Sequence, residues 1–253
     1  MNTLPTKVGS MWEFTLCIDG IDSLLAEAEY IKLKSQFALF NGLVSRYGSE
    51  KNEYFLFATK THTNEAKALV LNFICDTINT VWKKKFVSKC LKYNTSSKYK
   101  YDSIIQAMVS FDKKSDDEII AENFQFTNEM NLASFYNFRL RVLRQKWEQL
   151  IAITNENIGF LNFDETFLDI VRFLVEGIEV TSEIKVVQKN KDAQIYDINE
   201  NLIQTITRTT NSKLISYIIS KNPKSITLVG VDADLTEYLK NIFYNRIKIE
   251  NNS

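Results

Sequence analysis

Histidine, cysteine, proline and glycine are all scarce in this 253-residue chain. His62 is the only histidine, whereas nucleophilic triads usually need a histidine base. The three cysteines, Cys17, Cys75 and Cys90, are widely spaced and form no C-x-x-C pair. A structural zinc site needs about four Cys or His ligands, so the sequence argues against a zinc finger, and also against a disulfide framework. His62 lies among polar residues at an expected helix start, where an exposed or capping role is the simplest interpretation.

Seven glycines and two prolines leave no material for a glycine-rich phosphate loop or a flexible linker. The patterns G-x-x-x-x-G-K-[ST], G-x-G-x-x-G and G-x-S-x-G are all absent. Gly230 follows a short apolar run and precedes a possible helix cap, but one glycine cannot cradle a phosphate. We therefore predict no cofactor, no metal and no recognisable catalytic residue.

Charge of one sign is also missing, because 31 basic residues balance 31 acidic ones. No global field would steer the protein to nucleic acid or to an anionic membrane, so such a preference needs a local patch. No apolar run approaches the ~20 residues of a membrane span, and the N-terminus lacks the apolar core of a signal peptide. We expect a cytoplasmic protein without a membrane span.

The chain is otherwise ordinary for a globular protein, with 45% hydrophobic and 25% charged residues. Apolar residues recur at spacings of three and four through the middle of the chain, which is typical of amphipathic helices. Shorter alternating runs at both ends indicate strands. We predict an α+β protein with three segments, or one continuous domain: an N-terminal α/β segment, a helical core and a C-terminal α/β segment, over 1–60, 61–180 and 181–253.

Individual elements follow from the same patterns. Strands are expected at 13–18, 37–44, 53–59, 183–187, 193–196, 202–207, 225–229 and 246–249. Helices are expected at 22–34, 62–91, 102–110, 115–124, 132–155, 165–177, 213–220 and 234–243. Segments 37–44 and 53–59 form an expected hairpin, and Gly177 is the expected stop of its helix.

The most unusual charge pattern is a basic segment from Lys83 to Lys100, with no acid between Asp76 and Asp102. Its lysines are Lys83, Lys84, Lys85, Lys89, Lys92, Lys98 and Lys100. Tyrosines interleave with them, so the segment is a candidate for binding nucleic acid or an acidic protein. The alternative is a solvated helix end, where the dipole favours lysine. We name Lys83, Lys84, Lys85, Lys89 and Lys92 as candidate partner-binding or anion-binding residues.

Arg139 is the second unusual residue, because at 100° per residue it shares a face with Tyr136, Leu143 and Trp147. A guanidinium on an apolar face needs a partner, since burying an unpaired charge is costly. Arg139 is thus either a buried ion-pairing or carbonyl-capping residue or a candidate site for an anion or a partner. The acidic clusters, such as Asp116-Asp117-Glu118, fall at expected helix starts, where acids complement the helix dipole.

At this helix the sequence resembles a known family. Phe135-Tyr136-Asn137-Phe138-Arg139-Leu140 is similar to the F-x-x-F-R-L segment of the YtxC-like sporulation proteins. Further similar segments follow in the same order from about residue 36 to residue 250: 81–86, 194–197, 225–229, 240–243 and 246–247. The resemblance implies a cytoplasmic protein of endospore-forming bacteria that is associated with sporulation. It implies no reaction, cofactor or catalytic residue.

Three hypotheses remain for function. The first is a non-enzymatic interaction protein acting during sporulation or related cell-cycle events, with an unknown protein partner. The second is a nucleic-acid-binding accessory protein that uses the basic segment. The third is an enzyme whose site assembles from scattered acids and Arg139, which a deep pocket containing Arg139 and two carboxylates would favour.

Overall fold

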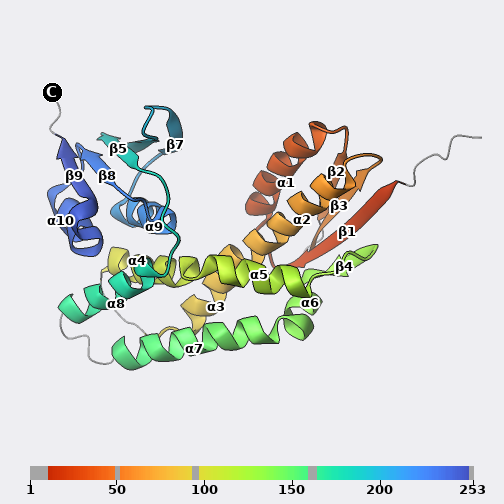
Figure 1. Ribbon diagram of the computed structural model, residues 1–253, viewed down its shortest axis with the longest axis horizontal. Helices are drawn as coiled ribbons and strands as arrows, with labels where there is room; N and C mark the ends of the chain where they lie inside the picture. Colours follow the sequence, from red (N-terminus) through yellow and green to blue (C-terminus); the bar gives the residue numbers. More distant parts are fainter. Residues whose placement is uncertain (1–10, 49–51, 93–96, 159–163, 251–253) are drawn as a thin grey trace, which may run out of the picture. The chain divides into compact units, whose positions relative to one another are not determined.

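The computed structural model describes residues 11–48, 52–92, 97–158 and 164–250. The chain has an α+β fold, as the sequence predicted, with helices and two mixed sheets (Figure 1). Its contacts group it differently from the three consecutive segments considered above. There are two compact units, each built from separate stretches of chain: Met1–Val81 with Asp117–Gln145, and Trp82–Asp116 with Lys146–Ser253. We call them unit 1 and unit 2.

Unit 1 is built on a four-stranded sheet in the order β2-β3-β1-β4. Its strands are β1 (Trp12–Asp19), β2 (Leu43–Gly48), β3 (Asn52–Thr59) and β4 (Glu129–Asn131). The long strand β3 lies between β1 and β2 and is antiparallel to both. A hairpin was predicted here, but its first strand is β2 at Leu43–Gly48 and not the predicted 37–44. The short strand β4 pairs parallel with β1 and was not predicted from the sequence.

Two helices, α1 (Ser23–Ala38) and α2 (Thr63–Asp76), cover one face of this sheet (Figure 1). Phe57 of β3 contacts Phe37 of α1, and Phe55 contacts Phe73 of α2. The sequence analysis wrongly placed Phe37 in a strand. Phe37 is in helical phase with the buried Leu33, so its ring packs into the core, and the helix ends at Ala38.

The predicted helix at 62–91 is helical throughout its length but not regular. After α2 the chain forms a π-helix, η1 (Thr77–Trp82), and continues as α3 (Lys83–Cys90). Single π-helical turns within helices are rare and frequently mark functional sites. Here the π-helix ends immediately before the first lysine of the basic segment.

The predicted helix at 132–155 is wrong in its continuity. It is divided into α6 (Leu132–Arg139) and α7 (Arg141–Ile158), because Leu140 leaves the helical conformation with φ −102° and ψ 37°. Leu140 itself is fully buried. The break therefore places an apolar side chain inward at the point where α6 ends.

Unit 2 contains a five-stranded sheet in the order β7-β6-β5-β8-β9. The strands are β5 (Ile184–Lys189), β6 (Asp192–Tyr196), β7 (Leu202–Ile206), β8 (Ile226–Val229) and β9 (Ile247–Glu250). Strands β5, β8 and β9 pair parallel, and the helix between β8 and β9 is α10 (Ala233–Phe243). All five strands follow the predicted runs.

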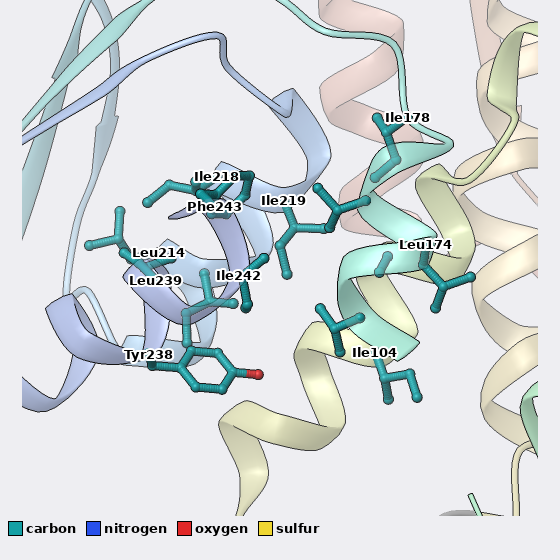
Figure 2. Packing of buried hydrophobic residues seen from close by; sticks show 14 of the residues in the cluster. Ile104, Leu174, Ile178, Leu214, Ile218, Ile219, Tyr238, Leu239, Ile242 and Phe243 are labelled. Atoms are coloured by element: carbon teal, nitrogen blue, oxygen red, sulfur yellow. The ribbon is translucent and has the colours of Figure 1, made fainter. Parts of the chain in front are cut away.

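The remaining helices of unit 2 pack with this sheet around one apolar core. They are α4 (Lys98–Ser110), α8 (Asp164–Glu176) and α9 (Asn211–Lys221). Figure 2 shows Ile218 and Ile219 of α9, Leu239 and Ile242 of α10 and Ile104 of α4 within this cluster. Helix α5 (Lys113–Asn123) begins in unit 2, and α8 ends before Gly177, as predicted. Burial of these apolar side chains is the main source of the stability of the unit.

Candidate site at a buried lysine–aspartate cluster

Lys83 is buried, although the sequence analysis grouped it with the surface lysines. Its residue is only 1% exposed, and it begins α3 directly after the π-helix. Its ammonium donates hydrogen bonds to Asp116 Oδ2 at 2.7 Å and to the carbonyl oxygen of Phe111 at 3.0 Å. Lys83 lies four residues before the buried Val87, so the regular turn of α3 carries both side chains inward.

Asp116 is the centre of the cluster and is fully buried. It lies in the first turn of α5, as the helix-start interpretation predicted, but it also accepts three hydrogen bonds. They come from Lys83 Nζ at 2.7 Å, from Lys146 Nζ at 2.7 Å and from the indole Nε1 of Trp147 at 2.9 Å. A buried carboxylate needs such partners, because its desolvation is otherwise very costly.

Lys146 closes the cluster on its more exposed side. Its ammonium donates to Asp116, to Ser115 Oγ at 3.0 Å and to Asp112 Oδ2 at 2.6 Å. Burial acts to lower the pKa of Lys146, but the hydrogen bonds to Asp112 and Asp116 outweigh it, and the pKa is raised. For Lys83 the balance is reversed: burial dominates over the attraction of Asp116, and its pKa is lowered.

A cavity of about 530 Å³ in unit 2 is bordered by this cluster. Lys83, Asp116, Lys146 and Trp147 form its charged side. The other walls come mostly from α7 and α8, with one aromatic ring from the α4–α5 connection; they are Phe111, Gln149, Leu150, Ile153, Thr154, Asn157, Thr166, Asp169, Ile170 and Phe173. A largely apolar cavity of this size with a few convergent polar groups is the usual form of a small-molecule site.

Gly177 supports one wall of the cavity from outside. A side chain at this position would meet the ring of Phe111, so only glycine leaves that ring where it lies. The carbonyl oxygen of Gly177 accepts a hydrogen bond from the Asp112 N–H at 3.1 Å. The end of α8 and the connection between α4 and α5 are thereby held together.

The other lysines of the basic segment lie at the surface. Lys84, Lys85 and Lys89 of α3 are exposed, and so is Lys92 just after the helix. Residues 93–96 are outside the described part of the chain. The structure thus separates Lys83 from the other candidate lysines: one is buried in an ion-pair cluster and four face solvent.

Arg139 was expected on a buried face, and this expectation is wrong. It is exposed, because α6 ends at Arg139 and the neighbouring Leu140 takes the buried position. Arg139 borders a groove of about 460 Å³ in unit 1, together with Phe138 and the carboxylates Glu122 and Glu129. The groove has the composition that the enzyme hypothesis required. However, these charged side chains are all exposed, and charges in water contribute far less to catalysis than charges in a dry site.

Sequence reasoning missed Asp116 and Lys146 as parts of a site. A signal for Asp116 was present, because Ile120 and Phe124 lie four and eight residues further on and are also buried. The same argument applied to Lys83 and Val87. Lys146 gave no comparable signal, because it is partly exposed and only its neighbour Trp147 belongs to the apolar stripe.

The sequence and the structure were also compared with known proteins. No family model, curated protein or solved structure matches the chain. Within the described residues, no helix is long and apolar enough to cross a membrane, and no group of three or more His, Cys, Asp or Glu side chains is placed to hold a metal ion.

Proposed function

We propose that this chain is a non-enzymatic binding protein that acts in the sporulation of a spore-forming bacterium, and that the cavity of unit 2 is its ligand site. The YtxC-like resemblance is the basis for the cellular context. The observation that carries the binding role is the cavity itself, with apolar walls on one side and a buried Lys83–Asp116–Lys146 cluster on the other.

The geometry favours binding over catalysis. Asp116 accepts three hydrogen bonds within the cluster, and Lys146 donates all three of its ammonium hydrogens to protein acceptors. A general acid or base must be able to exchange its proton with a bound substrate. A group whose hydrogen bonds are committed to the protein serves better to fix the shape of a binding site.

The experiment fills the cavity without disturbing the core. Ile153 borders the cavity but is 54% exposed, so a larger side chain there has room to be accommodated. In a spore-forming host that carries the gene, Ile153→Trp should lower the yield of heat-resistant spores with the protein level unchanged. Ile31→Trp is the matched control, since Ile31 is 59% exposed and lies on α1 of unit 1. Normal sporulation of the Ile153→Trp strain would contradict the proposed role of the cavity.

The protein partner of such a role would be sought in the same strains. Affinity capture of the wild-type protein and of Ile153→Trp from sporulating cells, followed by mass spectrometry, would show which partners depend on the cavity. Partners recovered equally with both proteins would have to bind elsewhere.

Nucleic-acid binding is the second candidate function, and it rests on the exposure of Lys84, Lys85, Lys89 and Lys92. Exposed lysines on one short segment can neutralise phosphates. Lys83 cannot take part in this role in the folded protein, because Asp116 and Phe111 hold its ammonium in the interior.

A further inference from the structure

The charge balance of the cavity limits the ligands that it can accept. Two ammonium groups, Lys83 and Lys146, face two carboxylates, Asp116 and Asp112, in a connected set of ion pairs. The set has no net charge. An anionic ligand would add a third negative charge beside Asp116, and a cationic ligand would meet Lys83 and Lys146.

The hydrogen bonds of the cluster restrict the ligand further. Lys146 donates to three protein acceptors, and the indole N–H of Trp147 donates to Asp116. An ammonium group has three hydrogens, and Lys83 donates to two acceptors, the Phe111 carbonyl oxygen and Asp116. The third hydrogen of Lys83 has no hydrogen-bond acceptor among the described residues. The ammonium also lies 5.6 Å from the centroid of the Trp147 ring, a weaker contact than a hydrogen bond to an oxygen atom that enters the cavity.

The remaining walls offer more apolar than polar surface; Gln149, Thr166 and Asp169 also border the cavity, and the charge of Asp169 is paired with Arg172 at 2.7 Å. The rings of Phe111 and Phe173 lie 5.9 Å apart between centroids, and Ile153 and Ile170 also border the cavity. The polar side chains of α7 on this side are largely committed: the hydroxyl of Thr154 donates to the Leu150 carbonyl oxygen at 2.7 Å, and the amide of Asn157 to that of Ile153 at 2.7 Å. Contact with these walls favours an aromatic or aliphatic body.

From these observations, and resting on the proposed function, we infer that the cavity binds an electrically neutral, largely apolar small molecule that carries one hydrogen-bond-accepting oxygen, directed at Lys83. The apolar body fills the space between Phe111, Phe173 and Ile153. The oxygen accepts the third hydrogen of the buried Lys83 ammonium.

Three probes of one shape separate the parts of this inference. They are 2-acetylnaphthalene, which is neutral and has a carbonyl oxygen, 2-naphthoate, which is an anion at pH 7, and 2-ethylnaphthalene, which is neutral and has no acceptor. Binding to the full-length protein would be measured by isothermal titration calorimetry. The acetyl probe should bind about tenfold more tightly than the ethyl probe, as expected for one hydrogen bond to a charged group. The affinity of the acetyl probe should also exceed that of the anionic probe by about tenfold or more, because a second buried negative charge is costly.

Variants test whether the acetyl probe binds in the cavity. Ile153→Trp and Ile170→Trp should each lower the affinity for the acetyl probe by about tenfold, because the larger side chain occupies the space of the probe. Ile31→Trp should leave this affinity unchanged. Two independent filling variants guard against the loss of one to misfolding, which thermal melting of each protein would reveal.

The outcomes distinguish this inference from the proposed function. If the anion binds as well as or better than the acetyl probe, and the filling variants abolish its binding, the cavity remains a ligand site but the neutral class is wrong. Equal binding of the acetyl and ethyl probes would overturn the role of Lys83. If none of the three probes binds, or the filling variants leave all binding unchanged, both the inference and the binding role of the cavity are overturned.

Discussion

Lys83 of unit 2 and Arg139 of unit 1 are basic residues near irregular points of the helical region, and they differ in burial. Lys83, which the sequence grouped with surface lysines, is buried against Asp116. Arg139, which the sequence placed on an apolar face, is exposed beside a groove. The π-helix precedes the first residue, and a break in the helix follows the second.

The difference shows where helical periodicity can be trusted. Lys83 is followed by regular α3, so its phase relative to Val87 correctly indicates burial. Arg139 is the last residue of α6, and its phase relative to Leu143 and Trp147 was counted across the break at Leu140. A residue count at 100° per position holds only within one regular helix.

The largest effect that tests this contrast should come from Asp116→Ala. The substitution leaves Lys83 buried without its carboxylate and removes an acceptor from Lys146 and Trp147. Breaking a buried pair in this way should lower the free energy of unfolding by about 5 kcal/mol, measured by urea denaturation. Glu29→Ala is the control, because Glu29 pairs with Lys32 at the surface and should cost no more than about 1 kcal/mol. Equal costs for the two variants would mean that the cluster is not buried as described.

The next largest effect should come from Trp147→Ala, which removes the largest fully buried side chain. The sequence analysis placed Trp147 on an apolar helix face, and the residue is only 1% exposed. The cavity left behind and the lost hydrogen bond to Asp116 should cost about 3–5 kcal/mol in the free energy of unfolding. Chemical denaturation of the two proteins side by side measures the difference. A cost below that of an ordinary surface substitution would contradict the burial of the indole.

A smaller effect concerns the exposed lysines around α3. If they bind nucleic acid, Lys84, Lys85, Lys89 and Lys92 can neutralise about four phosphates, which should contribute about 2.8 to the magnitude of the log–log slope of affinity against salt, at about 0.7 per phosphate of a single strand. Changing Lys84, Lys85 and Lys89 to Gln should flatten this slope. Fluorescence anisotropy with a labelled single-stranded oligonucleotide would measure it. Absence of binding at low salt would leave these lysines as a solvated part of the helix.

The smallest effect on stability should come from Arg139→Lys. Because Arg139 is exposed at the end of α6, its replacement should change the free energy of unfolding by less than about 0.5 kcal/mol. A marked loss on thermal melting would show that the guanidinium has a structural partner after all. A sporulation assay of the same variant adds information: unchanged melting with lost sporulation would make the groove of unit 1 a functional surface.

The sequence was sufficient for most of the fold because local patterns and tertiary packing agree there. The C-terminal strands and helices follow their apolar runs, and Gly177 ends α8 as predicted. The short strand β4 was not predicted, since three residues carry too little pattern and gain their pairing only from β1. Phe37 was misplaced because a β-rich run around it also fits a helix whose phase is set by Leu33.

The candidate site was less predictable because its parts are far apart in the chain. Lys83, Asp116 and Lys146 are brought together from three helices, and their partnership depends on how those helices pack. The pattern within α3 and α5 indicates that Lys83 and Asp116 point inward, but not that they meet. The cavity arises from the way the helices pack, and the spacing of residues in the sequence does not predict it.

The glycine that ends α8 also affects the shape of the cavity. Gly177 does not border it, yet a methyl group there would press on the Phe111 ring, which does. The hydrogen bond between Gly177 and Asp112 ties the two backbones, so the ring must yield rather than the chain. A substitution at position 177 would thus change the shape of the cavity through the Phe111 ring without replacing any of the residues that border the cavity.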